Sequence, residues 1–121
     1  MARPRQHRPP AWAVLEQALL QRRPVRARYH GTERVLCPHA LGWKNARPKV
    51  LSYQAGPAAP SAEPRQRWRS MFVDEIEDPV ITDGRWETAD NYSPETNGID
   101  DLEISVGMPT DDPFRSGDLF K

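Results

Sequence analysis

The sequence predicts a mainly β protein, in which one helix precedes a small β-barrel or sandwich. Three observations predict it: an apolar stripe at helical spacing over 11–23, several short stretches after it that alternate apolar and polar residues, and turn-forming residues between those stretches. At 121 residues the chain has the length of one domain with arms. We divide it into a basic, Pro-rich arm over 1–10, a folded domain over 11–89 and an acidic tail over 90–121 that we expect to be largely disordered.

The predicted helix rests on the spacing of its apolar residues. Steps of three and four residues separate Trp12, Leu15, Ala18 and Leu19. Such a stripe forms one face of an amphipathic helix. Arg22 and Arg23 suit its C-terminal turn, and Pro24 ends it, because proline cannot continue the helical hydrogen bonds.

The predicted strands follow this helix. Four main strands are expected at Val25–His30, Glu33–Cys37, Lys49–Gln54 and Arg65–Phe72. Gly31 supplies a tight turn, which makes the first two a hairpin. Pro38 is expected to end the second strand, because proline has no N–H to donate. Shorter strands are expected at Val80–Thr82 and Leu102–Val106.

Charge is divided end to end along the chain. Residues 1–70 carry 14 Lys and Arg against 3 Asp and Glu, a formal charge of +11. Residues 71–121 carry 3 against 14, a formal charge of −11. Such asymmetry indicates either an electrostatic partner or one half shielding the other.

Cysteine use and the terminal composition indicate a cytoplasmic protein without a membrane partner. Cys37 is the one cysteine, so an internal disulfide is excluded and a reducing compartment is expected. The basic N-terminal residues are followed by no apolar region of the kind that secretion signals carry. No apolar run approaches the length that crosses a bilayer.

Several segments resemble the WYL domain, a family named for a Trp-Tyr-Leu tripeptide. The resemblance spans about residues 11–85 and is carried by Ala18-Leu19-Leu20-Gln21-Arg22-Arg23-Pro24-Val25, Tyr29, Arg34-Val35-Leu36-Cys37-Pro38, Lys49–Gln54 and Val73-Asp74-Glu75-Ile76. It implies an Sm-like, SH3-type small β-barrel preceded by a helix. It also implies a non-enzymatic module that senses ligands or binds nucleic acid in transcription regulation, phage defence or helicases, through a basic and aromatic face.

This chain looks like a free-standing, divergent member of that family. Lys49-Val50-Leu51 stands where the name-giving tripeptide is expected, so that only the Leu matches. On the last main strand, Phe72 replaces a typical Arg, and Asp74-Glu75-Ile76 replaces Asp-Arg-Ile. Arg34 matches the family's basic position. These changes affect the implied ligand more than the implied fold.

Arginines and aromatic residues interleave along the predicted strands. We expect them to bind an anionic ligand, single-stranded nucleic acid or a nucleotide, because guanidinium groups bind phosphate in pairs of hydrogen bonds and aromatic rings stack on bases. The candidate binding residues are Arg26, Arg28, Tyr29, Arg34, Trp43, Lys49, Tyr53, Arg67, Trp68 and Arg69.

Strand alternation groups the arginines into two rows. Arg26, Arg28 and His30 share one face, and Arg65, Arg67 and Arg69 share one face. If the two strands are neighbours, the rows form one positive stripe. The alternative is that these arginines are only the solvated face of a half-buried sheet, with the aromatic residues in the core.

No motif in the sequence indicates an enzyme, a metal or a cofactor. Cys37 and His39 are two residues apart, but Pro38 lies between them and no third residue to orient the histidine is evident. One cysteine and three histidines do not form a spaced metal motif. We therefore expect a non-enzymatic protein.

Two alternatives stay open. The chain could be a protein-interaction or oligomer-forming module that docks through a barrel edge or through its acidic, Phe-containing tail. That tail could also fold back on the basic face and compete with phosphate for it, or serve only to keep the chain in solution.

Overall fold

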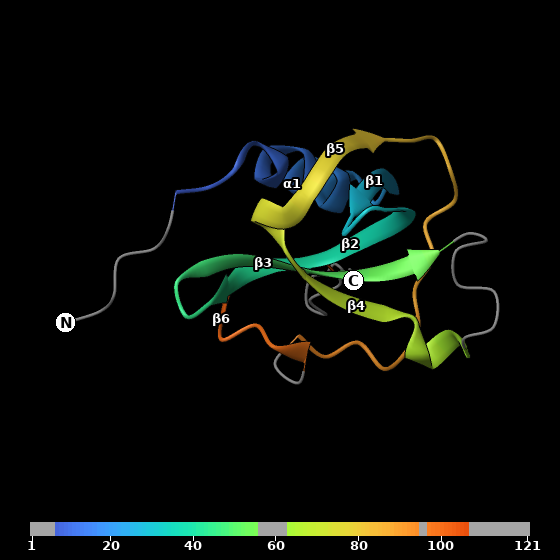
Figure 1. Cartoon of the computed structure of the whole chain (residues 1–121). Helices are drawn as coiled ribbons and strands as arrows, with labels where there is room; N and C mark the ends of the chain where they lie inside the picture. The colour runs from blue at the N-terminus through green and yellow to red at the C-terminus, as the bar shows by residue number, and fades with distance from the viewer. Residues whose placement is uncertain (1–6, 56–62, 95–96, 107–121) are drawn as a thin grey trace.

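Six antiparallel strands and one helix make up the part of the chain that the computed structural model describes, which is residues 7–55, 63–94 and 97–106 (Figure 1). The first six residues of the predicted arm, and residues 107–121 of the predicted tail with its phenylalanines, lie outside the described residues. The elements are the α-helix α1 (Pro10–Gln21), the strands β1 (Val25–Tyr29), β2 (Thr32–Lys44), β3 (Arg47–Ala55), β4 (Trp68–Phe72), β5 (Ile76–Ile81) and β6 (Asp101–Ser105), and two single turns of 3-10 helix, η1 (Pro64–Gln66) and η2 (Val73–Glu75).

The strands follow the order β4-β3-β2-β1-β5, and β6 pairs with the C-terminal half of β2. This arrangement confirms the mainly β class and the single helix before the strands. The hydrogen-bonded order ends at β4 on one side and at β5 on the other. The sheet is therefore open, and closure into a barrel stays a prediction.

Helix α1 presents the predicted apolar stripe to the sheet. Its buried residues are Ala11, Trp12, Leu15, Ala18 and Leu19. The helix ends earlier than predicted, because Arg22 adopts a left-handed conformation with φ of 52° and its N–H bonds to the Leu19 carbonyl. No helix of the described residues is long and apolar enough to span a membrane.

Strand β2 continues through Pro38, so the predicted end of this strand was wrong. Pro38 pairs with Ser52 of β3, and the register shifts by a residue before Ala40. On its other edge β2 pairs with β1 as far as Leu36 and with β6 from Ala40 onward. Proline is tolerated here because it lies where β2 exchanges one neighbour for the other.

The two arginine rows do not form a stripe. Only Arg69 of the second row lies in β4, since Arg65 belongs to η1 and Arg67 precedes the strand. Strands β1 and β4 are separated by β2 and β3, so the condition for a continuous stripe is not met. The predicted strand Arg65–Phe72 was too long because η1 occupies its first residues.

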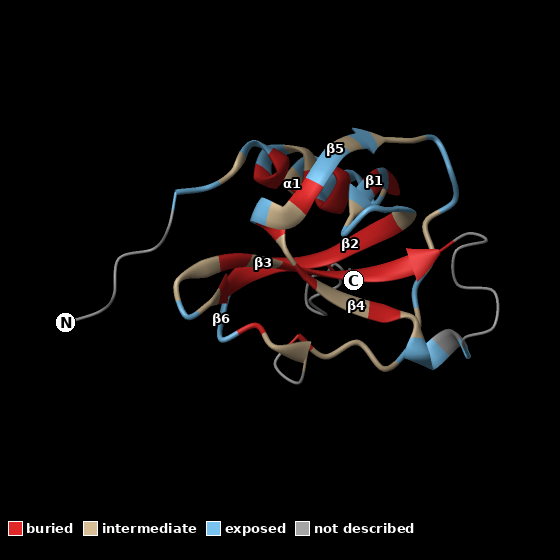
Figure 2. Cartoon of the chain, in the orientation of Figure 1, coloured by how far each residue is buried: buried red, intermediate tan, exposed pale blue. Residues whose placement is uncertain are grey.

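Both faces of the sheet are covered. Helix α1 packs on one face and forms a first core with Leu36, Leu41 and Val50 of β2 and β3. The second core lies on the other face and contains Cys37, Ala40, Leu51, Tyr53, Ala55, Trp68 and Ile99. Strands β2 and β3 are consequently buried along most of their length (Figure 2).

The chain after β5 covers the second core. It descends from the end of β5, runs below β4 and returns to β2 as β6 (Figure 1). Trp86, Ala89 and Tyr92 pack against that core, and Ile99 is buried in it. Residues 90–94 and 97–106, which fall in the predicted tail, are therefore part of the folded structure, and the predicted strand at Leu102–Val106 is confirmed as β6.

We expect Gly42→Ala to lower the free energy of unfolding by about 2 kcal/mol, as overpacking does. A Cβ at this position would lie 2.4 Å from the Asp101 carbonyl oxygen and 2.6 Å from Ile99 Cγ2, so β6 has to shift. The matched control is Gly84→Ala, whose Cβ has no neighbour closer than 3.4 Å. Urea denaturation of both variants checks this, and equal losses would contradict a close β2–β6 contact.

Candidate functional site

The two oppositely charged halves of the chain meet in ion pairs. Arg47 bonds Asp74 at 2.9 Å and Glu75 at 2.6 Å, and Arg28 Nη1 lies 3.4 Å from an Asp78 oxygen. Other pairs between the halves are Arg8–Glu103, Arg23–Asp83, His30–Glu75, Lys44–Asp100 and Arg65–Asp90. For these cations, the acidic half shields the basic half.

Glu75 lies at the centre of one such group. Its carboxylate contacts His30 Nε2 at 2.6 Å and Arg47 Nη2 at 2.6 Å. The hydrogen bond from His30, followed by that from Arg47, lowers the pKa of Glu75. Arg47 also stacks over the Phe72 ring at 3.7 Å, so this guanidinium contacts two carboxylates and a ring.

Three of the predicted aromatic binding residues belong to the interior. Trp43 and Tyr53 are each 2% exposed, and Trp68 is 9% exposed. Trp43 stacks on Trp12 with ring centroids 5.1 Å apart, and Tyr53 meets Trp68 edge to face at 5.2 Å. Their faces are occupied by protein, so in this structure they cannot stack on a base.

The other predicted binding residues are spread over several elements. Tyr29 of β1 is half-buried and stacks on His30, and Arg34 of β2 lies 5.5 Å over the Tyr29 ring. Lys49 of β3 lies 4.8 Å over the Phe72 ring. The ten residues are therefore not brought together as one basic and aromatic face.

The arginines near β4 and Arg26 of β1 differ in how far they are exposed and engaged by other residues. Arg69 donates from one nitrogen to the carbonyls of Gln66 and Trp68, each at 2.9 Å, and Arg67 is half-buried between η1 and β4. Arg26, by contrast, is exposed on β1 and forms no ion pair with any described residue. Arg26 is thus the predicted residue best placed to meet an anion from solvent.

A groove of about 450 Å³ lies along the segment that follows β5. Its lining residues are Arg85, Trp86, Glu87 and Thr88. Arg85 is exposed and has no ion pair within the described ranges, and Trp86 is half-buried. The combination of an unpaired guanidinium, a partly accessible indole and a hydroxyl suits an anionic ligand that carries a ring.

Two further arginines bear on this region. Arg26 is opposite Val35 in the β1–β2 register, and Val35 packs against the second core. Arg26 therefore lies on the sheet face that carries the second core. Arg22 lies close enough for its charge to act on His39 beneath the groove.

His39 contacts two of the residues that line the groove, Trp86 and Thr88. It is 2% exposed, and its ring stacks on Trp86 with centroids 4.6 Å apart. Nδ1 lies 2.7 Å from the Cys37 carbonyl oxygen and Nε2 lies 2.8 Å from the Thr88 hydroxyl. Burial lowers the pKa of His39 to about 4, although its bond to Cys37 opposes this shift, so the imidazole is neutral near pH 7.

Cys37 and His39 are not arranged as a nucleophile and its base. His39 contacts the carbonyl of Cys37, whereas the Cys37 Sγ accepts a hydrogen bond of 3.4 Å from the Glu87 N–H. Burial raises the pKa of the Cys37 thiol to about 11. Over the described residues, no three His, Cys, Asp or Glu side chains gather as metal ligands.

The groove residues were missed by sequence reasoning. Arg85 and Trp86 follow Asp83-Gly84, a pair typical of turns, and no strand or helix pattern singles them out. A basic residue beside an aromatic one just after a turn was the available signal. It was too short to distinguish from an ordinary loop.

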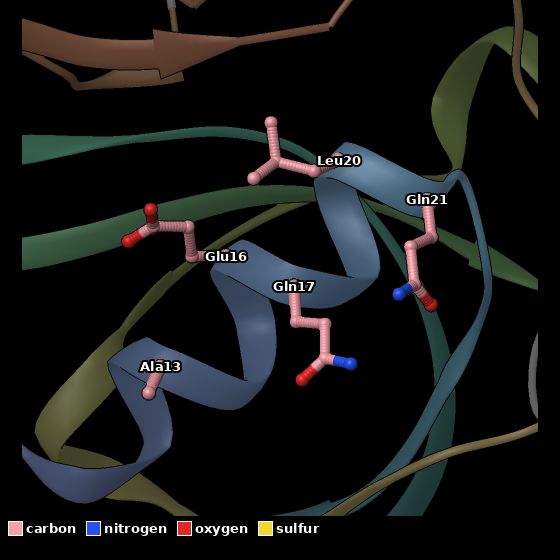
Figure 3. Close-up of a pocket in the computed structure, with 5 residues that line it drawn as sticks. All are labelled: Ala13, Glu16, Gln17, Leu20 and Gln21. Carbon is pink, nitrogen blue, oxygen red and sulfur yellow. The ribbon is translucent and has the colours of Figure 1, made fainter.

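A second hollow lies on the outward side of α1 and has a different character. It measures about 330 Å³ and is lined by Ala13, Glu16, Gln17, Leu20 and Gln21, which project from successive turns of this helix (Figure 3). Leu20 is 64% exposed. This hollow has a carboxylate and two amides but no cation, so it does not suit an anionic ligand.

We expect acid to destabilise the protein through His39. The unfolded chain binds a proton on this residue below about pH 6.5, whereas the folded chain resists it until about pH 4. Stability is therefore lost as the pH falls between these values, at up to about 1.4 kcal/mol per pH unit. Urea denaturation at pH 7, 6 and 5 of the native chain and His39→Gln checks this, and equal slopes in the two proteins would contradict it.

Comparison with family models, with curated proteins and with solved structures gave no match for this chain.

Proposed function

We propose that this chain is a non-enzymatic, ligand-binding regulatory module that resembles a WYL domain and binds an anionic ligand in the groove of Arg85–Thr88. The chemistry of the groove supports the ligand class. Arg85 supplies an exposed guanidinium that no described carboxylate neutralises, and Trp86 supplies a ring surface beside it. This pairing of an available cation with an accessible ring is the observation that carries the proposal.

The proposal includes an Sm-like or SH3-like barrel. The two outermost strands of the sheet, β4 and β5, are joined by the three residues of η2 alone. Phe72 and Ile76 therefore have to lie within a short length of chain of each other, which favours a sheet curled toward closure. The single helix before the strands also agrees with the resemblance.

A single nucleotide suits this groove better than a strand of nucleic acid. Single-strand binding uses successive aromatic platforms, one for each base. Trp43, Tyr53 and Trp68 are buried, which leaves Trp86 as the half-exposed indole at the groove. One ring and one nearby guanidinium fit one base and one phosphate. Arg26, on the same face, would take a second phosphate of a longer ligand.

A protein-interaction role is the second candidate. The outward side of α1 presents the exposed side chain of Leu20 in a hollow with polar edges. Exposed apolar side chains within polar rims are typical of protein contacts. This candidate uses a different surface from the groove, so one variant on each surface separates them.

We expect Arg85→Gln to weaken the binding of adenosine 5′-monophosphate about tenfold, because a hydrogen bond to a charged group contributes about 1.5–3 kcal/mol. The measurement is a calorimetric titration of the full chain at low salt. Arg65→Gln removes the same charge from an exposed residue that pairs with Asp90 outside the groove, and serves as the matched control.

The outcomes distinguish binding in the groove from an effect of net charge. Loss in Arg85→Gln with little change in Arg65→Gln supports the groove, and equal losses would indicate that only net charge matters. A short oligonucleotide titrated in parallel tests whether the chain binds single-stranded nucleic acid. If the native chain binds neither ligand, the proposal is wrong, and retention of a partner protein that depends on Leu20 would favour the second candidate.

A further inference from the structure

The structure determines to which atom the Thr88 hydroxyl donates its hydrogen bond. His39 Nδ1 lies 2.7 Å from the Cys37 carbonyl oxygen, which can only accept, so Nδ1 carries the hydrogen. A neutral imidazole has one N–H, and His39 Nε2 therefore has only a lone pair to offer. The contact of 2.8 Å between Nε2 and Thr88 Oγ1 then requires the hydroxyl to donate to the histidine.

A competing acceptor for this hydroxyl is weaker. The Ala89 carbonyl oxygen lies 3.5 Å from Thr88 Oγ1, at the limit for a hydrogen bond, whereas His39 Nε2 lies 2.8 Å away. The hydroxyl hydrogen of Thr88 therefore lies in the contact with His39 Nε2. Thr88 Oγ1 consequently has two lone pairs, and no hydrogen, to offer to a ligand.

The imidazole is fixed in this orientation. Its ring stacks on Trp86, meets the Trp68 ring edge to face at 4.7 Å, and lies 5.7 Å from the Tyr92 ring. A ring rotation would lose the bonds to Cys37 and Thr88 in a site that excludes water. Burial, by keeping the imidazole neutral, also keeps Nε2 an acceptor.

The groove thus combines donors and acceptors. Arg85 carries only donors, whereas Thr88 has lone pairs and Glu87 has a carboxylate, which can only accept. A ligand with an anionic group alone would leave the acceptors without a donor. A ligand that also carries a hydroxyl would satisfy both kinds of group.

We infer that Thr88 makes the groove selective for an anionic ligand that also donates a hydroxyl hydrogen bond, which within the proposed function means a nucleotide with sugar hydroxyls rather than one without them. The 2′ and 3′ hydroxyls of the sugar supply this donor, and the base is left to contact Trp86. This inference rests on the proposed function and adds the feature of the ligand that the groove selects. Thr88, rather than the cation, provides the selection.

The test compares two nucleotides on the full chain. Adenosine 5′-monophosphate and its 2′,3′-dideoxy analogue share the phosphate and the base and differ only in the sugar hydroxyls. We expect the native chain to bind the first about fivefold more tightly, the size of one neutral hydrogen bond. Thr88→Val, which keeps the shape and removes the lone pairs, is expected to abolish the difference, whereas Thr88→Ser is expected to keep it.

The outcomes separate the two proposals. If the native chain binds both nucleotides equally and Arg85→Gln weakens both, the groove stands and its selectivity for hydroxyls is overturned. If Thr88→Val is folded by circular dichroism and still discriminates, Thr88 is not the acceptor. If Thr88→Val does not fold, Thr88→Ser decides, because loss of discrimination in that variant also overturns the inference. If neither nucleotide binds the native chain, the proposed function and this inference both fall.

Discussion

Burial of both faces of β2 and β3 is the constraint on which the rest of this structure depends. One face carries Leu41 and Val50, and α1 covers it; the other carries Leu51 and Tyr53, and the chain after β5 covers it. Apolar side chains on both faces of a sheet need a layer on each side. The described residues of the segment that supplies the second layer form no strand before β6, and this segment places Trp86 against the second core.

The divided charge of the sequence acts largely inside the molecule. A sheet whose N-terminal strands are basic and whose last strand and covering segment are acidic brings opposite charges together wherever the layers meet. Arg47 with Asp74 and Lys44 with Asp100 are examples. Exposed pairs of this kind contribute little stability individually, so their main effect is on surface potential. Among the described residues, Arg26 and Arg85 are exposed cations without such an ion pair, and the proposed ligand would find them available.

Local patterns predicted the helix and the first strands well, because their apolar spacing reflects one buried face. The stripe from Trp12 to Leu19 and the alternation after Val25 are of this kind. Pro38 was wrongly predicted to end its strand. The prediction assumed that the strand keeps one neighbour on each edge, whereas β2 exchanges β1 for β6 at this position. The aromatic residues were misjudged because an indole suits a core and a binding face equally. Only the packing of Trp86 and Tyr92, which no local pattern encodes, shows that Trp68 lies in the interior. The candidate groove was missed for the same reason, because it too is formed by packing that no local pattern encodes.

The same packing links the groove to the stability of the fold. His39 contacts the second core through the rings around it and contacts the groove through Thr88. A ligand that accepts the geometry of Thr88 leaves His39 neutral and its bonds intact, so binding and folding favour the same protonation state. A ligand that needed Thr88 as a donor would take the hydroxyl hydrogen away from His39 Nε2 and leave this buried nitrogen without a partner, which costs free energy. Under the proposed function, the interior of this protein would constrain what its surface binds, and it would do so through one buried histidine rather than through the charges that dominate the sequence.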